Sequence, residues 1–106
     1  MEELTTIVRR ERWLLGILLF RLTELRQLEA AGEARFLPWA TAEVDDAIAR
    51  VREADLMREA LMSGTAGDGN AALWEHCGAI LELLDEVHSL RPALSLSSLV
   101  EFCKCA

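Results

Sequence analysis

The sequence contains few residues that break a helix or cross-link a chain. Its 106 residues include two prolines, six glycines, three cysteines and no tyrosine. Leu, Ala, Glu and Arg dominate, and strand signals are nearly absent, so the composition indicates an all-α protein. An odd number of cysteines without the spacing of a disulfide framework indicates a reducing compartment. We therefore expect a cytoplasmic protein with one helical domain over residues 1–106.

Basic residues are scarce in most of the chain. The formal net charge is −7, from 11 basic and 18 acidic residues. Residues 1–36 contain six of each sign, so residues 37–106 supply the whole excess of negative charge. Binding a phosphate backbone requires a positive surface, and this composition therefore excludes nucleic acid as an expected partner.

A long apolar run is also missing. The longest, Trp13–Phe20, is too short to span a bilayer, and the charged residues Arg21 and Glu24 stand where a signal peptide would have its cleavage site. A helix that lies on a membrane surface would need a basic polar face, whereas this one is mixed. We expect neither a signal peptide nor membrane insertion.

Side chains with catalytic or metal-binding chemistry do not form a recognised pattern. Cys103 and Cys105, with Cys77 and His88, suggest a metal site, but structural zinc sites need a second matching pair of ligands. The sequence has no phosphate-binding loop and no Ser/His/Asp arrangement, and adjacent acidic residues on a helix point in different directions. We expect no enzyme activity, no cofactor and no metal.

The apolar residues recur with helical periodicity. The pattern predicts helices over about 2–31, 37–62 and 71–90. Gly32 is placed to end the first helix in the left-handed conformation, and the short link after it favours an antiparallel hairpin. The third helix, which Arg91-Pro92 ends, would extend this hairpin to a three-helix bundle.

Two shorter segments complete the predicted organisation. The stretch Ser63–Gly69 has three glycines in seven residues and reads as a flexible link, with Asn70 as the N-cap of the third helix. Residues 96–102 predict a short fourth helix with a capping box formed by Ser98 and Glu101. A helix of that length needs to dock on the rest of the protein to be stable.

The first predicted helix carries apolar residues on two sides. Its broad stripe contains nine residues: Leu4, Ile7, Val8, Leu14, Leu15, Leu18, Leu19, Leu22 and Leu25. Trp13, Ile17 and Phe20 lie together on the opposite side, where a surface helix normally carries charge. Burying these three side chains would contribute roughly 5–8 kcal/mol, so we expect something to cover them.

The sequence is consistent with two explanations of the second apolar side. The first helix can be central in the bundle and touch neighbours on both sides, or Trp13, Ile17 and Phe20 can bind a partner. In the second case the partner is a second copy of the chain or an amphipathic helix of another protein. We take these three residues, together with Leu73, Leu81 and Leu84 of the third helix, as the candidate partner-binding residues.

Several segments of the first two helices resemble the N-terminal hairpin of the FlgN-type flagellar export chaperones, most closely the actinobacterial branch. The segments are Arg10-Glu-Arg12, Leu14-Leu15, Leu18-Leu-Phe-Arg-Leu22, Ala31-Gly32, and Leu37 with Ala40-Thr-Ala-Glu-Val44. The resemblance covers residues 7–62 and, more loosely, 73–102. It departs from the family in the break at Arg91-Pro92 and in the missing tyrosine near the C-terminus.

This resemblance implies a cytosolic chaperone. Such a protein binds the amphipathic C-terminal helices of hook–filament junction proteins and prevents their premature assembly before export. The alternative is a homodimeric helical bundle with an interaction or regulatory role and no export client. A secreted helical hairpin of the W-x-G class is disfavoured, because the segment from Gly32 to Trp39 lacks that motif.

Overall fold

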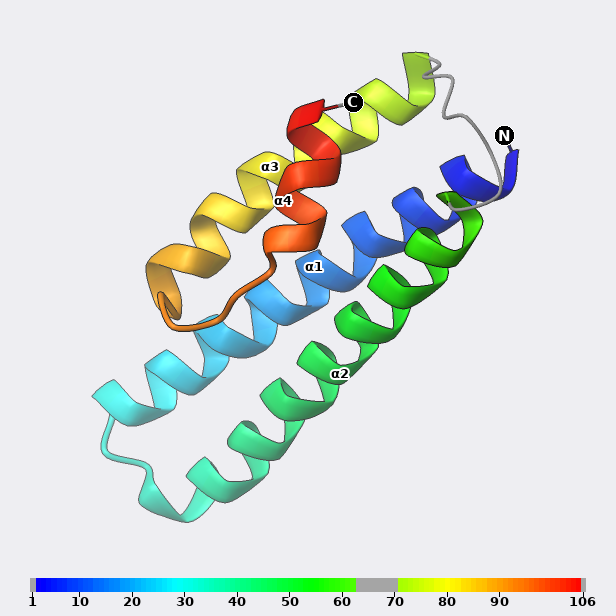
Figure 1. Cartoon of the computed structure of the whole chain (residues 1–106). Helices are drawn as coiled ribbons and strands as arrows, with labels where there is room; N and C mark the ends of the chain where they lie inside the picture. The colour runs from blue at the N-terminus through cyan, green and yellow to red at the C-terminus, as the bar shows by residue number, and fades with distance from the viewer. Residues whose placement is uncertain (1, 63–70, 106) are drawn as a thin grey trace.

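The computed structural model describes residues 2–62 and 71–105, and it is all-α, with no strand in these two ranges (Figure 1). The elements are α1 (Glu2–Ala30), a short 3-10 helix η1 (Ala34–Phe36), α2 (Leu37–Met62), α3 (Ala71–Leu90) and α4 (Ser97–Cys105). The ranges of α1, α2 and α3 differ from the predicted ones by one residue at most. The link predicted at Ser63–Gly69 and the cap predicted at Asn70 lie outside the described residues.

The turn after α1 has the geometry predicted for Gly32. Its φ is +70°, a conformation that is open to glycine at little steric cost. The Glu33 N–H donates to the Leu28 carbonyl at 3.0 Å, and the Gly32 N–H donates to the Glu29 carbonyl at 3.1 Å. This pair of bonds is a Schellman motif, which satisfies two carbonyl groups at the end of α1 and reverses the chain into η1 and α2.

Helix α1 lies between α2 and α3 and packs against both along its length (Figure 1). α2 runs antiparallel to α1, whereas α3 runs parallel to it. Two contacts set the register of α3: Arg12 Nη1 lies 3.2 Å from His76 Nδ1, and Arg26 Nη1 donates to the Leu90 carbonyl at 3.5 Å. Both contacts join residues 64 apart in the sequence, so a residue of α1 lies near the level of the residue 64 positions later in α3, to within about one helical turn.

The hydrophobic core is built around the predicted stripe of α1. The buried members of that stripe are Leu4, Ile7, Val8, Leu14, Leu15, Leu18, Leu22 and Leu25. They pack against buried residues of all the other helices, including Val44 and Val51 of α2, Ile80 of α3 and Leu99 of α4. The core therefore lies along one side of α1.

Helix α4 docks over this core through apolar and polar contacts. Leu99 and Cys103 are buried, and the Ser98 hydroxyl donates to Glu59 Oε1 at 2.6 Å and accepts from Arg58 Nη2 at 2.8 Å. The predicted capping box is therefore wrong, because Ser98 lies inside the first turn of α4 and its hydroxyl bonds to α2. Ser98 attaches α4 to the neighbouring helix.

Within the described ranges, no helix is both long enough and apolar enough to cross a membrane.

Candidate functional site: a groove between α1 and α3

A groove of about 860 Å³ lies between α1 and α3. Its apolar lining comes from Trp13, Ile17 and Phe20 of α1 and from Ala79 and Leu83 of α3. The α1 residues that line it run from position 9 to position 21, a length of about 18 Å at the rise of an α-helix. The groove is therefore about three helical turns long.

The two aromatic side chains of the groove are exposed to solvent. Trp13 is 65% and Phe20 is 60% exposed, while Ile17 is half-buried against the core. Helix α1 is central and touches neighbours on both sides, as one of the two explanations from the sequence requires. That central position nevertheless leaves Trp13 and Phe20 uncovered, because α4 packs over the opposite side of α1. The side of α1 with Trp13 and Phe20 is therefore open to solvent in a single copy of the chain.

Gly16 makes the groove deeper. It lies on the same side of α1 as Trp13 and Phe20, and it is level with Ile80, next to Ala79. A Cβ built at Gly16 would have no atom within 4 Å, so the space above the glycine is open. A larger side chain at this position would fill the groove without displacing the core.

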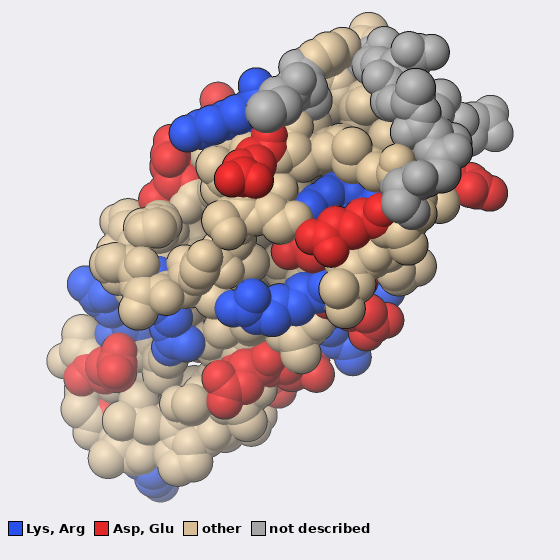
Figure 2. All heavy atoms as spheres, viewed as in Figure 1, with Lys and Arg blue, Asp and Glu red and all other residues tan. Residues whose placement is uncertain are grey.

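The two edges of the groove carry opposite charges. Arg9, Arg12 and Arg21 line it on α1, whereas Glu82 and Glu86 line it on α3. Arg21 also forms ion pairs with Glu24 at 3.4 Å and with Glu43 of α2 at 3.3 Å, which hold its guanidinium beside the Phe20 ring. On the face seen in Figure 1, acidic and basic side chains are interspersed between broad uncharged areas (Figure 2).

The structure separates the residues that the sequence grouped as partner-binding. Trp13, Ile17 and Phe20 come together in the groove. Leu73 and Leu84 are buried in the core, and Leu81 is half-buried against it. None of these three leucines lines the groove in the described part of the chain, because the apolar stripe of α3 faces α1 and α4. The leucine that α3 contributes is Leu83, which periodicity did not distinguish.

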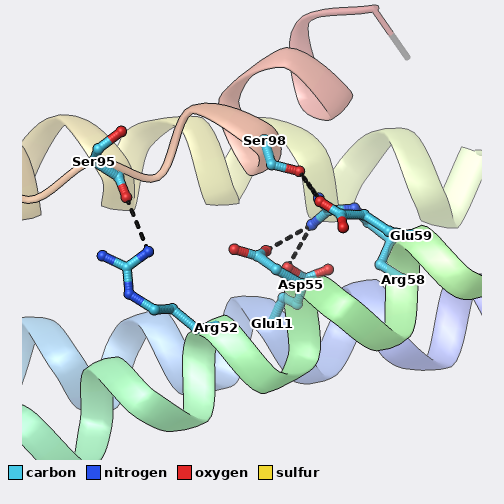
Figure 3. A network of polar contacts seen from close by, with 7 residues as sticks. All are labelled: Glu11, Arg52, Asp55, Arg58, Glu59, Ser95 and Ser98. Atoms are coloured by element: carbon cyan, nitrogen blue, oxygen red, sulfur yellow. Dashed lines mark hydrogen bonds and ion pairs between the residues drawn. The ribbon is translucent and has the colours of Figure 1, made fainter.

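A buried polar network joins α1, α2 and α4 on the other side of α1 (Figure 3). Arg58 Nη1 donates to Glu11 Oε2 at 2.6 Å and to Asp55 Oδ1 at 2.8 Å, and Glu11 and Arg58 are almost fully buried. The Phe102 ring covers the guanidinium, with its centroid 5.0 Å from Cζ. Glu11 Oε1 and Arg58 Nε have no hydrogen-bond partner among the described residues.

The sequence indicated only part of this network. Asp55 and Arg58 lie three residues apart on the inward side of α2, a spacing that predicts an ion pair at the edge of the bundle. The pair is present, but it lies in the interior and not at the edge. The sequence patterns did not identify Glu11 as a buried residue. The signal that could have identified it is its position inside the apolar stripe, between Val8 and Leu14, where a carboxyl group requires a buried partner.

Burial and, to a smaller extent, a hydrogen bond with Asp55 raise the pKa of Glu11 to about 9, while the charge of Arg58 acts in the opposite direction. Two carboxyl groups share one guanidinium, so the network is neutral when Glu11 keeps its proton. We interpret it as a structural centre, since α4 and Phe102 cover it.

Cys77 of α3 and Cys103 of α4 are buried free thiols that hydrogen-bond to each other. This bond and burial raise the pKa of Cys103, whereas the same bond lowers the pKa of Cys77. Across residues 2–62 and 71–105, no group of three or more His, Cys, Asp or Glu side chains is arranged to hold a metal ion. The two thiols contribute to the contact between α3 and α4.

Comparisons of the chain with protein-family models, with curated proteins and with solved structures give no match. The interpretation of the groove therefore rests on its own geometry.

Proposed function

We propose that this chain binds an amphipathic helix of another protein in the groove between α1 and α3. The observation that carries the proposal is the pair of exposed aromatic side chains, Trp13 and Phe20, beside the open space over Gly16. Large aromatic residues are the commonest energetic anchors of protein interfaces. A bound helix would cover them as α4 covers the other side of α1.

The shape of the groove favours a helix over a small ligand. Its lining follows about three turns of α1, and its apolar residues are flanked by charged edges. An amphipathic helix that places apolar residues at i, i+3, i+4 and i+7 into the groove would leave its polar side in solvent. The charged edges would then contact the polar flanks of the bound helix.

The client class in this proposal comes from the resemblance of residues 7–62 to FlgN-type chaperones. The client would be the amphipathic C-terminal helix of a flagellar hook–filament junction protein, held in the cytoplasm so that it does not assemble before export. The acidic, all-helical chain and its exposed groove are compatible with this role.

A substitution that fills the groove tests the proposal. We expect the wild-type chain to bind a peptide of the junction-protein C-terminal helix with a dissociation constant of tens of micromolar or lower, measured by calorimetry. Gly16→Leu should weaken binding at least about 10-fold, because its side chain occupies the place of the peptide. Fluorescence of Trp13 in a Trp39→Phe/Trp74→Phe background should shift to shorter wavelength when the peptide binds.

Gly78→Leu is the matched control. Gly78 is also a helical glycine, and a Cβ there meets no atom within 4 Å, but it is exposed on α3 outside the groove. Both substitutions replace a helical glycine, so both variants should be at least as stable as the wild type. The proposal fails if the wild type does not bind the peptide or if Gly16→Leu binds as tightly as Gly78→Leu.

A further inference from the structure

The groove between α1 and α3 has basic residues on one helix and acidic residues on the other. Its α1 edge carries Arg21, its α3 edge carries Glu86, and the register of the two helices places Arg21 level with residue 85. Arg21 and Glu86 therefore lie within about one helical turn, about 5.4 Å, of each other in height along the helices. Opposite charges thus stand at similar heights on the two edges.

A two-fold axis parallel to α1 would use this arrangement. If two copies face each other groove to groove around such an axis, α1 of each copy lies against α3 of the other, and heights along the helices are preserved. Arg21 then stands opposite Glu86 of the second copy, and symmetry repeats the pair. Phe20 then lies near the height of Leu83 of the second copy, and Trp13 lies near the height of Ala79 of the second copy. Apolar surfaces therefore also meet.

The other face-to-face arrangement is unfavourable. A two-fold axis perpendicular to the helices would place α1 of one copy against α1 of the other, so the two arginine edges would meet. It would also place α3 against α3, so the two glutamate edges would meet. Like charges that meet in an interface disfavour the association. The charges of the groove thus select the first arrangement.

We propose that, in the absence of a client helix, two copies of this chain associate groove to groove around a two-fold axis parallel to α1, with Arg21 of each copy paired with Glu86 of the other. The dimer covers Trp13 and Phe20, which a single copy leaves exposed. A client helix and a second copy then compete for the same groove. Because of this competition, which rests on the proposed function, binding of a client helix dissociates the dimer.

Charge reversal tests the pairing by sedimentation velocity. Wild type should dimerise at tens of micromolar, while Arg21→Glu and Glu86→Arg should each weaken self-association at least about 10-fold, because each homodimer then contains two like-charge pairs. An equimolar mixture of the two variants should dimerise as the wild type does. In that heterodimer one pair joins the two introduced side chains and the other joins the two native ones, so both pairs are attractive again.

The mixture separates this pairing from effects inside one chain. Arg21→Glu loses the ion pairs with Glu24 and Glu43 whether it is alone or mixed, so recovery has to come from the second copy. Asp45→Arg, at an exposed position of α2 outside the groove, makes a charge reversal of the same size and should leave the dimer unchanged. Circular dichroism establishes that each variant is folded.

A monomeric wild type overturns the inference, as do variants that dimerise normally or a mixture that stays monomeric. A peptide titration keeps the two proposals apart. If the peptide binds a monomeric wild type, client binding stands and the dimer does not. If the dimer behaves as expected but the peptide neither binds nor dissociates it, the dimer stands and client binding fails.

Discussion

At the scale of single residues, Glu11 shows how a charge inside an apolar stripe is accommodated. Its carboxyl group is buried beside Asp55, and both bond to Arg58, whose charge is enough for one of them. The network is neutral when Glu11 is protonated, which is the state that a raised pKa favours. The stability of the protein should therefore depend on the proton that Glu11 carries.

We expect the free energy of unfolding to fall as the pH rises from about 5 to 9. The pKa of Glu11 is about 9 in the folded protein and 4.5 ordinarily, so the folded state holds a proton that the unfolded chain has released. The stabilisation is complete below the ordinary pKa and is lost as the pH rises through the folded one, with a slope of at most about 1.4 kcal/mol per pH unit. Urea unfolding across this range measures it.

Glu11→Gln removes the titrating group and keeps the size of the side chain. The variant should remain folded and should lose most of the downward slope between pH 5 and 9. Equal slopes in the two proteins would show that Glu11 does not carry this proton.

At the scale of secondary-structure elements, the end of α1 depends on one backbone conformation. Gly32 adopts φ +70° and donates its N–H in the Schellman motif that directs the chain into α2. A Cβ at Gly32 would meet no atom within 4 Å, so any effect of adding one is conformational and not a steric clash with neighbouring residues.

Gly32→Ala should therefore lower the free energy of unfolding by about 1 kcal/mol, the strain of a left-handed alanine. Gly78→Ala is the control, because it adds the same methyl group inside a regular helix and should stabilise the protein by up to about 1 kcal/mol. Denaturation of the two variants should thus shift in opposite directions. If both shift in the same direction, the turn does not require a glycine.

At the scale of the whole molecule, the two apolar sides of α1 differ in how far the other helices cover them. The side with the leucine stripe is covered by α2, α3 and α4, and Leu99 of α4 is completely buried. On the other side, the described helices leave Trp13 and Phe20 more than half exposed. One side thus forms the hydrophobic core, whereas the other leaves Trp13 and Phe20 exposed to solvent.

Two truncations to alanine should separate these roles. Leu99→Ala should reduce the free energy of unfolding by about 2–5 kcal/mol, since it creates a cavity under α4. Phe20→Ala, measured at a concentration where the chain is monomeric, should change it by less than about 0.5 kcal/mol, because the ring is mostly exposed. A large loss of stability in Phe20→Ala would place this side in the core.

Several features follow from the sequence alone because they depend on neighbours along the chain. The 3.6-residue periodicity predicts the all-α class, the leucine stripe of α1 and the common face of Trp13, Ile17 and Phe20. The conformation of Gly32 follows from its position just after the end of the helical pattern. These properties need no knowledge of tertiary contacts.

Other features were decided only by the tertiary structure. Periodicity shows which residues share a face, but the face that meets each neighbour depends on contacts between distant segments. Leu83 therefore lines the groove while Leu73 and Leu84 are buried, and Ser98 bonds to α2 and does not cap α4. Glu11 is buried for the same reason, since Arg58, 47 positions away, supplies its counter-charge only after α1 and α2 have packed together.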